Sequence, residues 1–216
     1  MTGNPFTIVK AGKHQKRNMK SASLYFAIIL ITMASFITTG EPAKVKDYFG
    51  IPGPLQFGKA SYFLSWSAHP ANNYFKQEYL PANEKPDTYS NMMMIEVATG
   101  AIALGDIVKT KLNELEQRKK TDPLCNYQLI QNPKTGEYLL DFIMSVSTGG
   151  TTTIAEWNAY RYTKLPDQKG ILLFACSKRS YGAAIPSFLR LLKTKRANDV
   201  NTLSACSLPA IKIKPD

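Results

Sequence analysis

The sequence contains few of the residues on which most enzyme mechanisms depend. Its 216 residues include two histidines, and His14 lies in the basic N-terminal region, which leaves His69 alone in the rest of the chain. Zinc-ligand spacings such as CxxC and HExxH do not occur, and no serine lies in a GxSxG motif. These absences disfavour zinc enzymes and Ser-His-Asp hydrolases. We therefore expect no metal, no cofactor and no catalytic residues, and an enzyme is the less favoured class.

Cysteine is also scarce, and three residues are too few for a disulfide scaffold. Cys176 lies within the apolar stretch 171–177 and is expected to be a buried thiol. Cys125 and Cys206 lie at the ends of expected elements, and they could form one disulfide in an oxidising compartment. The alternative is that all three remain thiols.

The chain lacks an apolar run of the ~20 residues that span a bilayer, so we expect no stable transmembrane anchor. The longest apolar stretch, 24–37, follows five bases and precedes small residues at 38–40. Such an arrangement describes a secretory signal peptide. We expect residues 1–40 to be a signal peptide with a basic N-terminal extension, and the protein to be periplasmic or secreted. An uncleaved anchor and a start at Met19 are the alternatives.

Bases outnumber acids by 27 to 16, which gives a net charge of +11. The five bases and one acid of residues 1–43 account for +4 of this excess. Further bases lie at 118–120 and 193–196, where helices are expected to end and where the helix dipole favours positive charge. The net charge therefore indicates export and helix ends, and we expect no nucleic-acid partner.

The rest of the chain predicts one folded domain. Charged residues at 20% and aromatic residues at 11% argue against disorder. Residues 41–58 are rich in proline and glycine and are interpreted as a linker. Residues 59–204 then form the domain, and residues 205–216 form a C-terminal tail.

Alternating and continuous apolar runs predict seven strands, at 61–67, 73–80, 92–97, 127–131, 137–147, 152–162 and 171–177. The first should end at His69-Pro70, and the last should be a central strand because it is apolar throughout. Helical spacing predicts two helices, from Leu104 to about Lys120 and from Ile185 to about Arg196. The fold class is therefore α+β, with an antiparallel sheet of about six to seven strands and two main helices packed on it as an αβα sandwich.

This element order resembles the PsbP-like αβα-sandwich family, which includes uncharacterised bacterial exported proteins. Three segments carry the resemblance: 77–81 (QEYLP) with Glu84, the strand from Trp157 to Tyr162, and 179–182 (RSYG) before the last helix. The resemblance covers about residues 55–200. It implies a fold and no particular activity, because members of such a fold do unrelated jobs.

Interleaved arginine and tyrosine residues are the first candidate binding site. Arg161 and Arg179 should fall towards the same end of the sheet if the last two strands form a hairpin, and Tyr160, Tyr162 and Tyr181 lie beside them in the sequence. Such groups bind anions, sugars or nucleic acid, although cross-strand pairing within the sheet also explains them. A second candidate set is His69, Gln77 and Glu78.

Carboxylates are scattered through the domain, and alternation places Glu156 on the face of Asn158 and Tyr160, away from Trp157.

The leading interpretation is an exported, non-catalytic binding or accessory protein with an unknown protein or anionic ligand as partner. We expect it to be a monomer. The alternatives are a carboxylate-dependent hydrolase, which needs two convergent acids, or a basic-surface binder of anionic envelope polymer or lipid.

Overall fold

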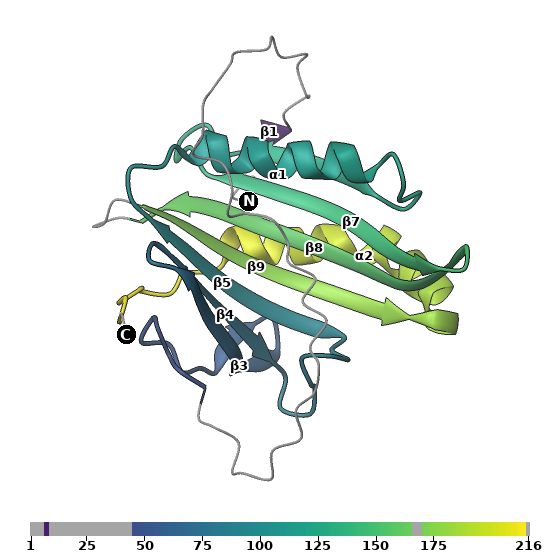
Figure 1. The fold of residues 1–216 in the computed structure, drawn as a ribbon, viewed down its shortest axis with the longest axis horizontal. Helices are drawn as coiled ribbons and strands as arrows, with labels where there is room; N and C mark the ends of the chain where they lie inside the picture. Colours follow the sequence, from purple (N-terminus) through teal and green to yellow (C-terminus); the bar gives the residue numbers. More distant parts are fainter. Residues whose placement is uncertain (1–6, 9–44, 166–169, 215–216) are drawn as a thin grey trace.

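A computed structural model of the chain describes residues 7–8, 45–165 and 170–214. The strands form one antiparallel sheet in the order β1-β6-β7-β8-β9-β5-β4-β3-β2 (Figure 1). The strands are β1 (Thr7–Ile8), β2 (Leu55–Phe57), β3 (Ala60–Ala71), β4 (Tyr74–Leu80), β5 (Asn91–Thr99), β6 (Asn126–Gln131), β7 (Tyr138–Thr148), β8 (Thr151–Lys164) and β9 (Gly170–Tyr181). The helices are α1 (Leu104–Arg118), the short 3-10 helix η1 (Gly182–Ala184) and α2 (Ile185–Ala205).

The α+β class, the antiparallel sheet and the two main helices are confirmed, but the strand number of six to seven is wrong. The main body contains eight strands, β2–β9, and Thr7–Ile8 add a ninth beside β6. The seven expected strands correspond to β3–β9. The additional strands have two or three residues, too few for alternation to be visible in the sequence.

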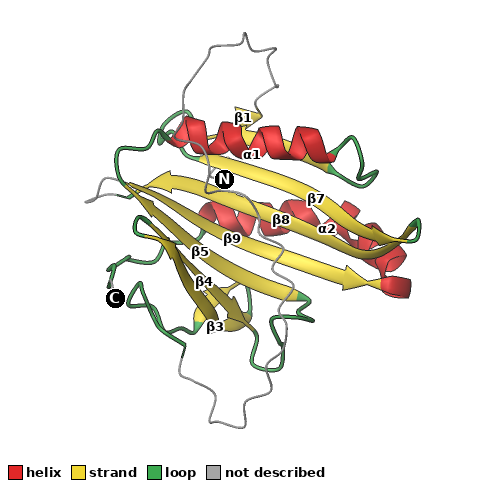
Figure 2. Ribbon diagram, viewed as in Figure 1, coloured by secondary structure: helices red, strands yellow, loops and turns green. Residues whose placement is uncertain are grey.

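The two helices lie on opposite faces of the sheet (Figure 2). In β8, Tyr160 and Tyr162 pack with α1, whereas Trp157 and Ala159 pack with α2. Neither helix extends over the whole sheet. On the α2 face the layer is completed by non-helical chain, because Tyr48 and Phe49 join the same core cluster as α2.

The segments expected to be a linker and a tail are therefore held against the sheet. Phe49 is fully buried, and its carbonyl oxygen accepts a hydrogen bond of 2.9 Å from the Lys212 amide. The Lys214 amide donates to the Tyr48 carbonyl at 2.7 Å. Ile211 and Ile213 pack against the core between these bonds. The two ends of the described main body thus lie side by side over β3–β5.

Two elements run further than the sequence predicted. Strand β3 continues through His69-Pro70 to Ala71, and proline is tolerated because β3 lies near the sheet edge. Helix α2 continues past Arg196 to Ala205, since Val200 and Leu203 extend the buried spacing that begins at Ile185 and Leu192. Bases expected at the end of this helix therefore lie in its middle.

The expected signal peptide lies outside the described residues, apart from Thr7–Ile8. Cleavage after Gly40 would remove β1 from the sheet. None of the helices in the described part of the chain is long and apolar enough to cross a membrane.

Candidate functional site

Five charged residues form a stripe across the sheet on the face that carries α1; they are Lys76, Glu78, Glu96, Glu156 and Arg179. Cross-strand pairing brings them together, because directly opposite residues share a face. Lys76 on β4 is opposite Glu96 on β5, and Glu156 on β8 is opposite Arg179 on β9. The prediction that Glu156 shares the face of Tyr160 and not that of Trp157 is confirmed.

Lys76 holds one end of the charged stripe together. Its Nζ lies 2.8 Å from Glu78 Oε1 and 3.7 Å from Glu96 Oε1. Burial alone would lower the pKa of Lys76, but Glu96 and Glu78 outweigh it and raise that pKa above its ordinary value. Burial, followed by Glu96, raises the pKa of the neighbouring Tyr74 hydroxyl.

Glu156 holds the other end. It accepts hydrogen bonds from Tyr89 Oη at 2.8 Å, Arg179 Nε at 2.6 Å and Asn158 Nδ2 at 3.1 Å. The Arg179 guanidinium also lies 4.1 Å from the centre of the Tyr89 ring. Burial and then Glu156 raise the pKa of Tyr89, and the Arg179 guanidinium opposes this shift.

The loop between β4 and β5 delivers Tyr89 to this cluster, and Glu84 shapes the loop. Glu84 Oε2 accepts hydrogen bonds from the amides of Ser90 at 2.5 Å and Asn91 at 2.9 Å. Tyr181 Oη then donates to the Tyr89 carbonyl at 3.0 Å. The loop is thereby fixed to the end of β9.

Aromatic residues of β3 continue the stripe towards the sheet edge. Trp66 is directly opposite Glu78, and Lys76 Nζ lies 5.7 Å from the centre of the Trp66 ring. Phe63 is 44% exposed. Strand β2 pairs with Ala60–Tyr62, so in the described part of the chain no strand lies outside β3 from Phe63 onwards. The stripe therefore meets an open strand edge that carries two large aromatic residues.

The sequence expectation for Arg161 and Arg179 is wrong in its geometry. Arg161 is opposite Phe174, five residues along β9 from Arg179, so the two arginines do not lie towards the same end of the sheet. They also differ in face, since Arg161 faces α2 and Arg179 faces α1. Arg161 is buried, contacts Glu137 at 3.1 Å, and donates to the carbonyls of Leu203 at 3.2 Å and Cys206 at 2.8 Å. It therefore ties the C-terminal end of α2 to the sheet and is not available to a ligand in this arrangement.

The three candidate tyrosines, Tyr160, Tyr162 and Tyr181, share the α1 face, but the second candidate set is divided between the two faces. Tyr160 and Tyr162 are buried under α1. His69 stacks on Phe75 with ring centres 4.1 Å apart. Gln77 is fully buried and accepts the Tyr48 amide at 2.6 Å, which orders the lead-in segment. Of that set, Glu78 belongs to the charged stripe.

The candidate disulfide between Cys125 and Cys206 does not form, and all three cysteines are free thiols, which was the alternative. Cys125 packs in the cluster under α1, whereas Cys206 packs against the cluster on the α2 face. The sheet therefore separates their sulfur atoms. Cys176 is buried, as expected, and burial raises the pKa of its thiol.

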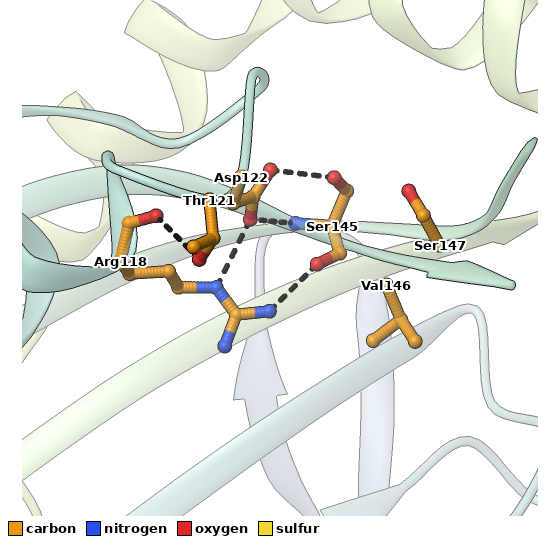
Figure 3. A pocket seen from close by; sticks show the side chains of 6 residues that line it. All are labelled: Arg118, Thr121, Asp122, Ser145, Val146 and Ser147. Carbon is orange, nitrogen blue, oxygen red and sulfur yellow. Dashed lines mark hydrogen bonds and ion pairs between the residues drawn. The ribbon is translucent and has the colours of Figure 1, made fainter. Parts of the chain in front are cut away.

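A hollow of about 310 Å³ lies where α1 ends against β7 (Figure 3). Its polar groups bond to one another: Asp122 accepts the Ser145 amide and hydroxyl, each at 2.6 Å, and Arg118 Nε at 3.0 Å. Burial opposes ionisation of Asp122, but these hydrogen bonds outweigh it and lower the pKa. The residues lining the hollow are Arg118, Thr121, Asp122, Ser145, Val146 and Ser147. These hydrogen bonds connect the C-terminal end of α1 to β7.

Among the described residues, no group of three or more histidine, cysteine or acidic side chains is arranged to hold a metal ion. A protein-family model matches residues 49–208, more than half of the chain. Searches of curated proteins and of solved structures gave no match.

Proposed function

The chain belongs to the family whose model matches residues 49–208, and we propose that it is an exported, non-catalytic accessory protein that binds a partner protein. The contact surface is the open edge of β3 from Phe63 onwards together with the charged stripe. The resemblance to the PsbP-like family remains part of the proposal and adds a fold, not an activity.

The observation that carries this proposal is a pair of aromatic residues on a strand edge that no other strand of the described chain pairs with. An open edge offers backbone donors and acceptors to an extended segment of another protein, and side chains of alternate residues supply specificity. Phe63 is exposed, and Trp66 is partly exposed beside Lys76. Tryptophan is enriched among the residues that dominate binding energy at protein interfaces. The edge and the aromatic residues therefore suit a partner that adds a strand.

The charged stripe supports binding over hydrolysis. A glycoside hydrolase keeps two carboxylates apart so that the substrate bond and a water fit between them. Here Lys76 Nζ contacts both Glu78 and Glu96 and occupies that position. Glu156 already accepts three hydrogen bonds from its own chain. Glu96 and Glu156 are buried, so the stripe offers a partner the half-buried side chains of Lys76, Glu78 and Arg179, which carry both signs of charge and favour its orientation.

Photocrosslinking in the native host tests the proposal. The crosslinking residue p-benzoylphenylalanine replaces Phe63, and in a matched control it replaces Lys109, an exposed residue of α1. We expect position 63 to give a discrete adduct with a second protein, and position 109 to give none. Trp66→Ala in the position-63 protein should reduce the adduct at least fivefold. Identical adducts from both positions, or an adduct with twice the chain mass, would contradict the proposal.

A further inference from the structure

Helix α2 carries an excess of positive charge on its exposed face. It contains four bases, Arg190, Lys193, Lys195 and Arg196, and a single acid, Asp199. Asp199 forms an ion pair with Lys178 of β9 at 2.7 Å, and Arg196 forms one with Asp141 of β7 at 3.2 Å. The other three bases are exposed, and no carboxylate of the described chain lies within 4.0 Å of them.

The helix dipole does not account for these three bases. Its effect is confined to the last turn of a helix, and α2 ends at Ala205, ten residues after Lys195. Helix α1 provides the contrast within the same protein. Its three acids and three bases balance, and Lys111 pairs with Glu114 at 3.1 Å. The charge of α2 is therefore a property of its outer surface.

An exposed leucine lies among these bases. Leu191 is 57% exposed, and with Phe63 it is one of the two large exposed apolar side chains of the described chain. At 3.6 residues per turn, Lys195 lies about 40° around the helix from Leu191 and Arg190 about 100°, whereas Lys193 lies about 160° away at the other margin of the exposed side. The apolar face of α2 is packed on the sheet, so Leu191 is the apolar side chain that this helix exposes beside its bases.

We propose that the outer face of α2 docks on the surface of an anionic lipid bilayer. The three bases are attracted to acidic headgroups, and Leu191 enters the boundary of the acyl chains. A soluble polyanion would explain the bases but offers no apolar phase for the leucine, so the combination favours lipid. The C-terminal tail packs on the same face of the sheet and adds the exposed Lys212.

This docking is compatible with partner binding, because the two surfaces lie on opposite sides of the sheet (Figure 2). Lipid would contact α2, while the charged stripe on the α1 face would point away from the bilayer. Lipid binding is independent of the proposed function, since the variants that test each surface lie on different faces.

Sedimentation with vesicles tests this proposal, using one preparation of the protein whose N-terminus is checked by mass. Vesicles of phosphatidylcholine containing phosphatidylglycerol are compared with phosphatidylcholine alone. We expect binding to the anionic vesicles that weakens with salt. Each base should contribute about fivefold, so the triple variant Arg190→Gln, Lys193→Gln, Lys195→Gln should bind on the order of 100-fold more weakly. Lys109→Gln in α1 is the matched control and should bind as the wild type does.

A substitution of Leu191 distinguishes binding to lipid from binding to a soluble polyanion. We expect Leu191→Ala to weaken vesicle binding roughly tenfold, through lost apolar burial, and to leave binding to polyphosphate unchanged. All variants change exposed residues, so an unchanged thermal midpoint checks that they fold. Vesicle binding that survives the triple substitution would overturn the proposal, because the contact would then lie elsewhere. Vesicle binding that is indifferent to Leu191→Ala would assign the face to a soluble polyanion and would also overturn it.

Discussion

Replacing Arg161 by alanine should destabilise the fold strongly without affecting partner binding. The Arg161–Glu137 pair is buried, with each side chain 11% exposed. Arg161→Ala would leave the Glu137 carboxylate buried without its partner, and removal of one member of a buried ion pair costs about 3–5 kcal/mol. Two carbonyl oxygens at the end of α2 would lose their donor in addition.

Urea denaturation followed by the fluorescence of the buried Trp157 measures this loss. With a denaturant dependence of about 2 kcal/mol per molar urea, the midpoint should fall by about 1.5–2.5 M. Arg190→Ala, which removes an exposed arginine, is the matched control and should change the free energy of unfolding by less than about 0.5 kcal/mol.

A double variant separates loss of the pair from loss of packing. Arg161→Met with Glu137→Leu replaces both charges by apolar side chains, and such replacements of buried pairs are often close to neutral. A loss below about 1 kcal/mol for Arg161→Ala, the value typical of surface pairs, would refute the structural role of this arginine. A loss of the position-63 adduct at unchanged stability would refute it equally.

Three further predictions follow from the burial and hydrogen bonding of single residues. The pKa of Asp122 is lowered in the folded state, so this carboxylate stabilises the fold above its unfolded pKa of about 3.9, and the stabilisation is lost as the pH falls below that value. Asp122→Asn should therefore lower the free energy of unfolding by about 1–3 kcal/mol at pH 7, and by progressively less in urea denaturation at more acidic pH. Burial raises the pKa of Tyr62 to about 12, so the stabilisation from its neutral hydroxyl is complete below the unfolded pKa of about 10 and is lost as the pH rises towards 12. Ultraviolet titration of the wild type and of Tyr62→Phe should show one late-ionising tyrosine fewer in the variant. Because the Cys125 and Cys206 thiols are free, reductant should change neither the mass nor the thermal midpoint, and a two-dalton difference in mass would contradict this.

The strands themselves could be predicted, because alternation and apolar runs are local signals. The apolar stretch 171–177 indicates a central strand, and β9 indeed lies between β8 and β5. Which strands become neighbours is not a local property. Strand β5 pairs with β9, so that Asn91 lies directly opposite Lys178, although most of the domain's sequence separates the two residues. The charged stripe depends on such pairings, and no motif in the sequence links Lys76 to Glu96 or Tyr89 to Glu156.

The failure for Arg161 and Arg179 has a simple physical reason. In the β8–β9 hairpin, Arg179 is opposite Glu156 and shares its face. Arg161 lies five residues from Glu156 along β8, and this odd separation places it on the other face. A shift of one residue in this register would place both arginines on the same face, because side chains alternate along a strand. The sequence of the connecting turn indicates where the chain reverses, but it does not define that register. Neither the face nor the burial of Arg161 could therefore be predicted.

Helix α2 is longer than its sequence predicts because two local signals conflict. Bases at 193–196 are typical of a helix C-terminus, whereas the apolar spacing continues through Val200 and Leu203. No glycine or proline follows to end the helix before Ala205. The correct length changes the meaning of the bases, from partners of the helix dipole to an exposed surface.

Hydrogen exchange along β3 tests whether its open edge receives a strand from a partner protein. Amides of β3 from Phe63 onwards are compared between the free protein and the complex isolated through position 63. We expect alternate amides of this segment to exchange quickly in the free protein, since no strand of the described chain lies outside them, and at least tenfold more slowly in the complex. Protection of these amides in the free protein, or exchange unchanged in the complex, would contradict it.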